Sequence, residues 1–539
     1  MENVIKHWIN NSDPETSAEL SVLSSEELND RFYKEIEFGT GGMRGVIGAG
    51  RNRINKYTVA KATQGYAEYI KSMGGENEGI VIAHDNRHYS RYFAEVSAGV
   101  LAANGIRSYL FEDLRTTPEL SFSVRELKAF GGIVITASHN PPEYNGYKLY
   151  DRSGGQLVPS DIAPILSAME KIDDELSIPV MPLSEAGELV KTVGEEIDRV
   201  YYERVLSLRF DKGTDKNIKI VYSPQHGTGS IPVRYVLKEA GYDVIAVESQ
   251  CVPDPDFSCT RNPNPEMPEA YDEAIKLLIS ENADLAIATD PDCDRLGVVV
   301  NDGGKTVLLT GNQSGAIILY YILSRRKELG TIPKNAVMFT TVVTSVLGEK
   351  IAEDFGVSVE KTLTGFKFIG EKIRLHEEAA DMTFVFGYEE SNGCLIGDFV
   401  RDKDGVQASL MMCEAADYYK KQGKTLLDVL NDIYEKYGEY KDLLYSVTMK
   451  GEDGGKKIAQ IMARLRSQKI DEIAGLRVKT VTDFKNDVTD LPKTDLMLYS
   501  FEDGGFVAVR PSGTEPKCKF YYCVKDADVN TLRNYFENV

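Results

Sequence analysis

The amino-acid sequence predicts an α/β protein with three successive α/β domains, built on mixed sheets, and a smaller α+β domain at the C-terminus. Its 539 residues are enough for three or four domains of about 150 residues each. Short apolar strands run repeatedly into glycine-rich or polar turns that lead into helical patterns. Near Tyr440 this pattern gives way to shorter strands. We therefore expect domains over residues 1–208, 209–310, 311–435 and 436–539.

The composition disfavours several classes of partner. The formal net charge of −21 argues against nonspecific binding to nucleic acids or to anionic membranes. A local cluster of arginine and lysine can still bind a phosphorylated small molecule, because scattered surface charge is screened over about 8 Å. The apolar run near Ala316–Leu323 is far shorter than the ~20 residues that a membrane helix needs.

The N-terminus and the cysteines predict a cytoplasmic location. The first residues, MENVIKHWINN, lack the basic segment and apolar core of a signal peptide. The seven cysteines are scattered and include no C-x-x-C pair, which is typical of a reduced protein rather than of a disulfide framework. The sequence leaves the oligomeric state open between a monomer and a dimer.

The stretch Gly131–Tyr150 combines a buried strand with an unusual loop. Its apolar run ends at Ile135 and breaks into a loop that contains Ser138, His139 and two prolines. A hydroxyl group therefore lies at the tip of a tight loop after a strand. A serine beside a histidine is by itself more often a polar turn than a nucleophile. The G-x-S-x-G pattern of acyl hydrolases is absent from the sequence.

A second strand leads into three alternating aspartates, Asp290, Asp292 and Asp294. In an extended loop, residues two apart project to the same side, so the three carboxylates repel one another and need a cation. Oxygen ligands alone suit a hard divalent ion such as Mg²⁺. Arg295 follows directly and is well placed for a phosphate oxygen. The alternative is a solvated acidic turn; an EF-hand is excluded because its glycine and final glutamate are missing.

Two other segments carry polar groups suited to a sugar phosphate. Phe38–Arg53 contains six glycines and three arginines, which predicts a flexible cationic loop, with Arg44 where a dinucleotide fingerprint would have its third glycine. A strand over Phe384–Phe386 leads into G-Y-E-E-S-N-G, in which Glu389 and Ser391 face the same side and suit vicinal sugar hydroxyls. Solvated turns are the alternative for both.

The C-terminal part offers a phosphate-binding turn within Phe506–Tyr522. A turn of serine, glycine and threonine between two strands exposes backbone N–H groups and hydroxyls, and an arginine adds a bidentate pair. The residues concerned are Arg510, Ser512, Gly513 and Thr514. A plain hairpin turn is the alternative. No Walker A sequence occurs, so a nucleotide donor is not indicated.

These motifs together resemble the α-D-phosphohexomutase family over nearly the whole chain and in the family's order. The matching segments are T-A-S-H-N-P with N-G-Y-K, F-G-T-x-G-x-R-G, D-x-D-x-D-R, T-G-F-K and R-P-S-G-T-E-P-K. The resemblance implies three α/β domains and a smaller C-terminal domain around a central cleft. It also implies a phosphoserine at Ser138 and one Mg²⁺ per chain, with the metal ligands Ser138, Asp290, Asp292 and Asp294.

The resemblance implies roles for further residues. Arg44 and Arg295 would offset charge on the moving phosphoryl group, and Lys148 or His139 would shuttle the proton. Substrate contacts are implied for Gly365 and Lys367 in T-L-T-G-F-K-F-I-G, for the hydroxyl-reading pair Glu389 and Ser391, for Lys403, and for Arg510, Ser512, Gly513 and Thr514. From the residues alone, the segment with Gly365 is equally a helix start, and the charged run with Lys403 a surface turn.

The resemblance predicts the interconversion of glucose 1-phosphate and glucose 6-phosphate through glucose 1,6-bisphosphate as intermediate and activator. Mannose and pentose phosphates, or synthesis of the bisphosphate, remain alternatives, as do a metal-dependent phosphatase and a non-catalytic sugar-phosphate-binding protein. Two residues depart from the family pattern. Asn392 replaces a phenylalanine of E-E-S-F-G and leaves the sugar less certain. Cys293 replaces a small residue, and we expect its thiol to point away from the metal.

Overall fold

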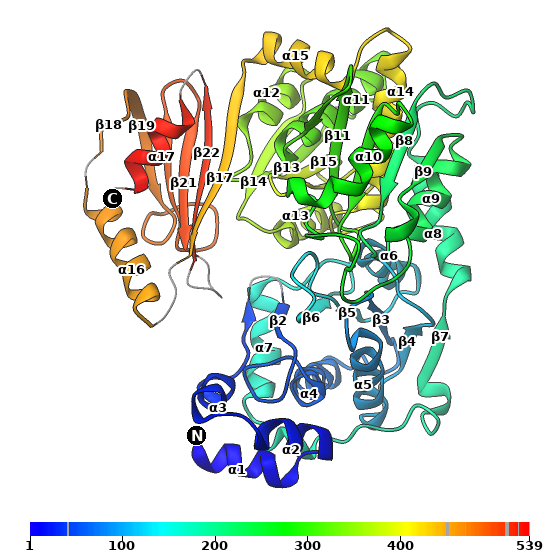
Figure 1. Cartoon of the computed structure of the whole chain (residues 1–539), viewed down its shortest axis with the longest axis vertical. Coiled ribbons are helices and arrows are strands. Elements are labelled where there is room, and N and C mark those ends of the chain that lie inside the picture. The colour runs from blue at the N-terminus through cyan, green and yellow to red at the C-terminus, as the bar shows by residue number, and fades with distance from the viewer. Residues whose placement is uncertain (40–41, 449–451, 469, 512–516, 526–527, 538–539) are drawn as a thin grey trace.

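The computed structural model describes residues 1–39, 42–448, 452–468, 470–511, 517–525 and 528–537. Its fold is the predicted one: three α/β units with mixed sheets are followed by a unit with an antiparallel sheet (Figure 1). Among the described helices, none has the length and apolar character that crossing a bilayer requires. All seven cysteines, each within the described ranges, are free thiols.

The first unit is a seven-stranded sheet in the order β1-β2-β6-β5-β3-β4-β7. Its parallel centre is flanked by antiparallel strands at one edge. Isoleucines of β3 and β5 face α4 and α5, and the alternate valines face α6, because successive strand residues point to opposite faces. The strands are β1 (Phe38–Gly39), β2 (Gly42–Val46), β3 (Ile80–His84), β4 (Ser108–Phe111), β5 (Gly131–Ile135), β6 (Tyr144–Tyr150) and β7 (Val190–Val193).

The helices of this unit begin with three short ones that precede the sheet and enclose a small core around Trp8. The helices are α1 (Glu2–Asn11), α2 (Pro14–Ser21), α3 (Ser25–Phe32), α4 (Lys56–Ser72), α5 (Ser90–Ala103), α6 (Thr117–Glu126), α7 (Pro159–Met169) and α8 (Glu195–Ser207), with 3₁₀ turns at Glu175–Ser177 and Gly187–Leu189.

The second and third units have smaller mixed sheets, ordered β12-β11-β10-β8-β9 and β14-β13-β15-β16. The strands are β8 (Lys219–Ser223), β9 (Asp243–Ala246), β10 (Leu285–Thr289), β11 (Leu296–Asp302), β12 (Lys305–Leu308), β13 (Ala336–Thr341), β14 (Ser358–Thr362), β15 (Thr383–Glu389) and β16 (Gly393–Leu395). The helices are α9 (Ser230–Glu239), α10 (Asp272–Ser280), α11 (Gly311–Glu328), α12 (Val346–Asp354), α13 (Phe366–Ala379), α14 (Gly405–Lys420) and α15 (Leu426–Tyr437), with 3₁₀ turns at Glu248–Gln250 and Pro268–Tyr271.

The C-terminal unit is an antiparallel sheet in the order β17-β22-β21-β20-β19-β18. One face packs with α16 and α17 around its own core, and the other face joins the core that runs through the three α/β units. In Figure 1 this unit (orange to red) stands beside the third α/β unit. Its elements are β17 (Tyr440–Thr448), α16 (Glu452–Ser467), β18 (Glu472–Ile473), β19 (Leu476–Asp483), β20 (Met497–Phe501), β21 (Phe506–Pro511), β22 (Lys517–Lys525) and α17 (Val529–Glu537).

One local expectation needs correction, and one open alternative is decided. The glycine-rich segment around Arg44 is not a free loop, because β2 pairs with β6 and places Arg44 opposite Gly146. The segment with Lys367 is the start of a helix, since Gly365 is the N-cap of α13 and Lys367 lies in its first turn. Glycine suits this N-cap, whose φ is +116°. In the first case the pairing of β2 with β6, which a single segment does not encode, decides between the two readings of the sequence.

Candidate active site

A cavity of about 240 Å³ gathers most of the predicted site residues. Its walls come from all four units of the fold. The predicted residues that line it are Arg44, Ser138, His139, Lys148, Asp294, Arg295, Gly365, Lys367, Glu389, Ser391, Lys403 and Arg510. Asp290 and Asp292 do not line it and are fully buried. Ser512, Gly513 and Thr514 lie outside the described residues. We call this cavity the cleft.

Ser138 lies in the loop that follows β5, with its backbone in the left-handed region at φ +51°. Its N–H donates to Thr136 Oγ1 at 2.8 Å, and its Oγ donates to Asp290 Oδ2 at 2.6 Å. His139 Nδ1 is 3.2 Å from the same Oγ. The buried guanidinium of Arg87 donates to the carbonyl groups of Ser138 and Pro141 at 2.6 and 2.8 Å, which holds the loop from behind.

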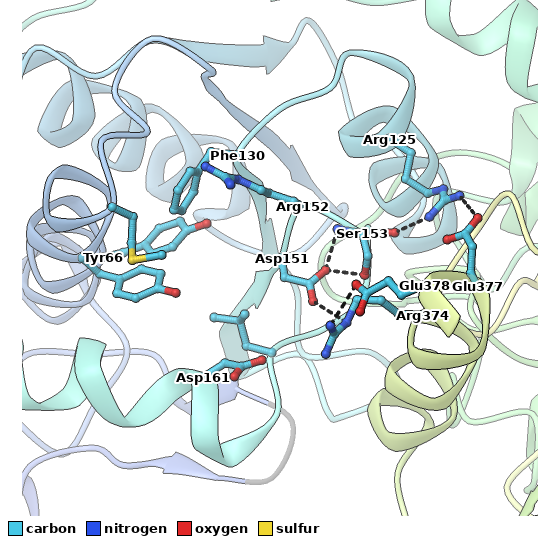
Figure 2. A pocket seen from close by; sticks show the side chains of 13 residues that line it. Tyr66, Arg125, Phe130, Asp151, Arg152, Ser153, Asp161, Arg374, Glu377 and Glu378 are labelled. Carbon is cyan, nitrogen blue, oxygen red and sulfur yellow. Dashed lines mark hydrogen bonds and ion pairs between the residues drawn. The ribbon is translucent and has the colours of Figure 1, made fainter. Parts of the chain in front are cut away.

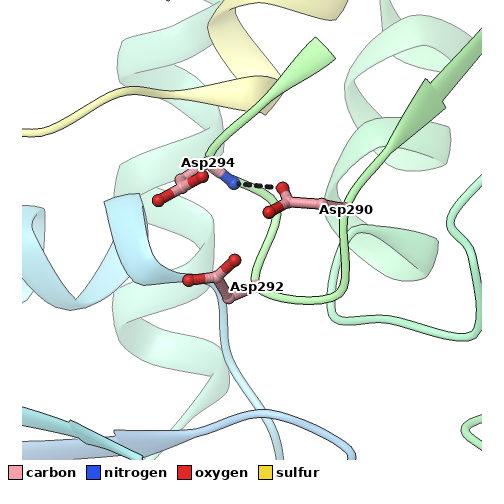
Figure 3. Close-up of side chains that lie close together, drawn as sticks. All are labelled: Asp290, Asp292 and Asp294. Atoms are coloured by element: carbon pink, nitrogen blue, oxygen red, sulfur yellow. Dashed lines mark hydrogen bonds between the residues drawn. The ribbon is translucent and has the colours of Figure 1, made fainter. Parts of the chain in front are cut away.

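The three aspartates of the loop between β10 and β11 turn their carboxylates toward a common centre (Figure 3). One oxygen from each lies within 4.8 Å of the others, and all three residues are buried. Asp292 Oδ1 and Asp294 Oδ1 are buried and have no hydrogen-bond partner in the described part of the chain. Buried carboxylate oxygens without donors are costly unless a cation binds them, so this set fits a hard divalent metal ion.

The backbone of this metal loop (residues 290–295) is held from several units. The carbonyl of Pro291 accepts from Thr228 N at 2.8 Å, that of Asp292 from Thr117 N at 2.9 Å, and that of Cys293 from Gly405 N at 3.0 Å. Thr117 Oγ1 also donates to Asp292 Oδ2 at 2.9 Å. The side chain of Cys293 is part of the hydrophobic core, as its soft thiol led us to expect.

Charges within the metal loop are strongly coupled. Burial raises the pKa of Asp290 well above its usual range, and the charges of Asp292 and Asp294 add to the effect. Burial also opposes ionisation of Asp292, but Lys148, whose Nζ is 2.9 Å from Asp292 Oδ2, outweighs it and lowers that pKa. Without a further cation, the loop therefore holds less than its full negative charge.

Lys148 and His139, the two predicted proton carriers, differ in charge. Burial lowers the pKa of Lys148, but Asp292 and Asp294 outweigh burial and raise it, so the ammonium keeps its proton. Burial lowers the pKa of His139 well below its usual range, helped by Arg295 and Arg44. Near neutral pH the cleft thus presents a charged donor at Lys148 and a neutral imidazole at His139 that can accept a proton.

Two arginines approach the loop that contains Ser138 and the metal loop. Arg44 Nη1 donates to Asn140 Oδ1 at 2.8 Å, which joins β2 to the loop with Ser138. Arg295 Nη1 is 2.5 Å from Glu266 Oε1. Sequence reasoning missed Glu266, which lines the cleft and orients this guanidinium. Its signal in the sequence is weak, because Glu266 only ends a proline-rich segment, from Asp254, that forms no helix or strand.

Glu389 is the last residue of β15 and Ser391 lies in the turn after it. Both line the cleft, and Ser391 Oγ donates to Glu389 Oε1 at 2.9 Å. Lys403 reaches the same wall and forms ion pairs with Asp294 Oδ2 at 3.0 Å and Asp402 Oδ1 at 3.3 Å. Its stem crosses Gly393, where a Cβ atom would come within 2.1 Å of Lys403 Cδ. A carboxylate, a hydroxyl and an ammonium thus converge, which suits neighbouring sugar hydroxyls.

A second group of cations lies around Arg510. The Nζ of Lys367 is buried and has no hydrogen-bond partner among the described residues. Burial, with the charge of Arg510, lowers its pKa to about 8. The same two causes lower the pKa of Lys519, which also lines the cleft. Three cations that repel one another fit an anion such as a phosphate group. Sequence reasoning missed Lys519, although its alternation with Lys517 places both on one face of β22.

A larger hollow of about 500 Å³ lies between α4, the turn after β6 and α13 (Figure 2). No predicted site residue lines it. Its arginines are engaged with carboxylates: Arg125 pairs with Glu377 at 3.2 Å and Arg374 with Glu378 at 3.1 Å. These charges satisfy one another, so the smaller cleft, with its unpaired groups, is the better candidate for the site.

Comparison with known proteins identifies the family. Models described as phosphoglucomutase/phosphomannomutase α/β/α domains I, II and III match residues 35–176, 199–304 and 310–437. A phosphoglucomutase of Staphylococcus epidermidis is 39% identical over 536 residues, covering 96% of this chain and 94% of that protein.

Solved structures agree. A putative phosphomannomutase from Thermus thermophilus is 25% identical with a TM-score of 0.71, covering 94% of this chain and 99% of that one. An N-acetylphosphoglucosamine mutase from Aspergillus fumigatus, solved with GlcNAc-6P and magnesium, shares the fold at a TM-score of 0.53 and 14% identity, covering 94% and 95% of the two chains. This chain belongs to the phosphoglucomutase/phosphomannomutase family, the phosphohexomutases, which are isomerases.

Proposed function

We propose that this protein interconverts α-D-glucose 1-phosphate and glucose 6-phosphate by way of glucose 1,6-bisphosphate, with Ser138 as the phosphorylated residue. One observation carries the proposal. The hydroxyl of Ser138, 2.6 Å from Asp290 Oδ2, opens into the same cleft as Lys367, Arg510 and Lys519, whose positive charges repel one another. A site that only binds a sugar phosphate needs the cations around Arg510 but has no use for a serine beside a metal loop. The naming of the curated relatives supports glucose as the sugar.

The proposal includes one Mg²⁺ per chain, held by Asp290, Asp292, Asp294 and an oxygen on Ser138. When bound, the ion would neutralise charge on the phosphoryl group as it moves. Arg44 and Arg295 border the same part of the cleft and would act in the same sense on the equatorial oxygens. Lys148 and Lys403, each within 4 Å of Asp294, would keep the metal loop from carrying excess negative charge.

The reaction would take place in two balanced transfers. In the first, the bond between the phosphorus and Ser138 Oγ breaks as a bond forms from the free sugar hydroxyl to the phosphorus. The hydroxyl proton passes to neutral His139, and charged Lys148 donates to the departing Ser138 oxygen. Glu389 and Ser391 would hold the sugar hydroxyls, while Lys367, Arg510 and Lys519 would hold the phosphate group that does not react. Gly365 would shape the same wall.

In the second transfer the bisphosphate has turned around in the cleft. Its other phosphoryl group moves to Ser138. The bond between that phosphorus and its sugar oxygen breaks as a bond forms from Ser138 Oγ to the phosphorus. The serine proton returns to Lys148, and protonated His139 donates to the departing sugar oxygen, which restores the phosphoserine and releases the isomeric monophosphate. Added glucose 1,6-bisphosphate would act as an activator because it rephosphorylates Ser138. We also propose that Ser512, Gly513 and Thr514 join Arg510 in holding the phosphate, as their sequence pattern predicts. The proposed location is the cytoplasm, where free thiols persist.

The first experiment is a turnover assay on glucose 1-phosphate with Mg²⁺ and a trace of glucose 1,6-bisphosphate. Mannose 1-phosphate and ribose 1-phosphate run in parallel. We expect glucose 1-phosphate to have the highest kcat/KM, and Ser138→Ala to lose turnover by more than about 10⁴-fold. A preference for mannose or ribose would overturn the assignment of the sugar and keep the reaction. Release of inorganic phosphate without isomerisation would overturn the reaction itself.

A further inference from the structure

Asn392 closes the hairpin that carries Glu389 and Ser391. Glu389 pairs with Gly393 across β15 and β16, so residues 390–392 form a three-residue loop. Loops of this length commonly end in a residue with left-handed backbone, and Asn392 has φ +63°. Asparagine accepts this conformation much more readily than a bulky residue such as phenylalanine. Asparagine therefore suits the backbone of this turn.

The side chain of Asn392 does not face the sugar. Glu389, Glu390 and Ser391 line the cleft, whereas Asn392 is absent from its walls and only 7% exposed. Its Nδ2 donates to the carbonyl of Leu296 at 3.1 Å, and its own carbonyl accepts from Leu296 N at 2.9 Å. One residue of the third unit therefore satisfies both backbone groups of one residue of the second.

Leu296 is the first residue of β11 and comes directly after Arg295 of the metal loop. On its other side Leu296 pairs with Thr289 of β10. The neighbouring strand β12 covers β11 only from Val299 onward, so the edge at Leu296 is left for another partner. Asn392 fills that place as a strand residue would, except that its side-chain amide replaces the backbone N–H.

We propose that Asn392 is a positioning residue that fixes the sugar-contacting hairpin to the metal loop. The link sets the distance between the pair that would hold the sugar, Glu389 and Ser391, and the centre that would transfer the phosphoryl group. Transfer depends steeply on such alignment, because misplacement of about 1 Å can cost about 10²-fold in rate. The expected effect on turnover rests on the proposed function. The mechanical link between the hairpin and the metal loop does not.

The left-handed backbone of Asn392 and its bridging side-chain amide can be tested separately by substitution. Asn392→Gly keeps the left-handed backbone and removes the bridging amide, whereas Asn392→Asp keeps the size and places a carboxylate against a carbonyl group. The matched control is Asn282→Gly, since Asn282 is also left-handed at φ +47° but is exposed and lies at the end of α10. Circular dichroism and thermal unfolding of each variant establish that it folds.

We expect Asn392→Gly to lower kcat/KM about tenfold and Asn392→Asp by more, with Asn282→Gly unchanged. The loss should be equal for glucose 1-phosphate and mannose 1-phosphate, because Asn392 does not touch the sugar. Unchanged kinetics in a folded Asn392→Gly would overturn the proposal. A loss confined to one sugar would overturn it as well, since it would make Asn392 a specificity residue.

Hydrogen–deuterium exchange tests the link without turnover. Adding Mg²⁺ to the wild-type protein should slow exchange both in the metal loop and in the hairpin peptide around residues 388–396. In Asn392→Gly the metal loop should still respond, and the hairpin should not. A hairpin that responds equally in both proteins would overturn the proposal. If wild-type protein shows this coupling but no mutase turnover, the proposed function fails and the positioning role stands.

Discussion

The metal loop and the cation group around Arg510 line one cleft but solve the problem of buried charge in different ways. Around the metal loop, positive and negative groups face each other, as Lys148 and Lys403 do with Asp292 and Asp294. Around Arg510, cations lie near one another: Lys367 is buried, Arg510 and Lys519 are half-buried, and burial lowers the pKa of both lysines. The first region is close to neutral before substrate arrives, whereas the second is completed only by an anion. The predictions below test this difference.

Metal removal should have the largest effect. Chelation with EDTA should abolish turnover by more than about 10³-fold, because charge stabilisation by a bound ion is worth several kcal/mol. Added Mg²⁺ should restore activity. Asp292→Asn should mimic chelation, and excess Mg²⁺ should not rescue it. Full activity in EDTA, checked by elemental analysis for residual metal, would show that the three carboxylates serve another purpose.

Lys148→Met should damage both activity and stability. Removing one partner of a buried ion pair leaves Asp292 uncompensated, which costs about 3–5 kcal/mol of unfolding free energy. Loss of a positioned proton donor should lower kcat by about 10²–10⁴-fold. Denaturant unfolding and steady-state kinetics measure the two effects. Stability that is equal to wild type would contradict the tight pairing in this region.

Lys367→Met should raise stability, in contrast to Lys148→Met, and should still impair function. A lysine whose pKa lies near 8 is buried at a cost, so its removal should raise the unfolding free energy by about 1–3 kcal/mol. The KM for glucose 1-phosphate should rise about tenfold, because an anion contact is lost. If Lys367→Met destabilised the protein, the ammonium would have to be paired in the folded state.

The pH dependence should follow from the same lysine. Because its folded pKa is lowered, Lys367 is charged below about pH 8 and loses its charge as the pH rises through that value. The kcat/KM, which reports the free enzyme, should therefore fall above about pH 8, and Lys367→Arg should remove this limb. The unfolded state binds the extra proton between about pH 8 and 10.5, so the stability difference between wild type and Lys367→Met should shrink over that range.

A hinge motion of the C-terminal unit is the smallest effect that we expect. One face of its sheet has a core of its own, while the other joins the core of the α/β units. Its described polar links to the third unit are few, such as the 2.7 Å bond from Thr310 Oγ1 to Asp442 Oδ2. Turning of a bisphosphate requires the cleft to loosen. Small-angle scattering should show a more compact particle with glucose 1,6-bisphosphate than without it. Identical curves, and crystals with the same domain angle, would count against the hinge.

The sequence predicted the fold class and gathered much of the site because several motifs lie at the ends of strands. Ser138 and Asp290 follow β5 and β10, and Glu389 is the last residue of β15; the carboxyl end of a strand fixes where the next loop must lie. Their catalytic and binding roles, and the four domain boundaries, stay predictions. The sequence could not show that Arg44 lies on a paired strand or that Glu266 holds Arg295. Both facts depend on contacts between segments about 30 to 100 residues apart.

The backbone of the metal loop has a consequence for how the protein could be divided. All three aspartates belong to the second unit, yet the carbonyl groups of Asp292 and Cys293 are bonded to Thr117 and Gly405 of its neighbours. A fragment that ends before Gly405 would contain every carboxylate and still leave the loop without part of its frame. Metal affinity would then report on assembly of the whole chain. The loop keeps its conformation only when the units on both sides are folded against it.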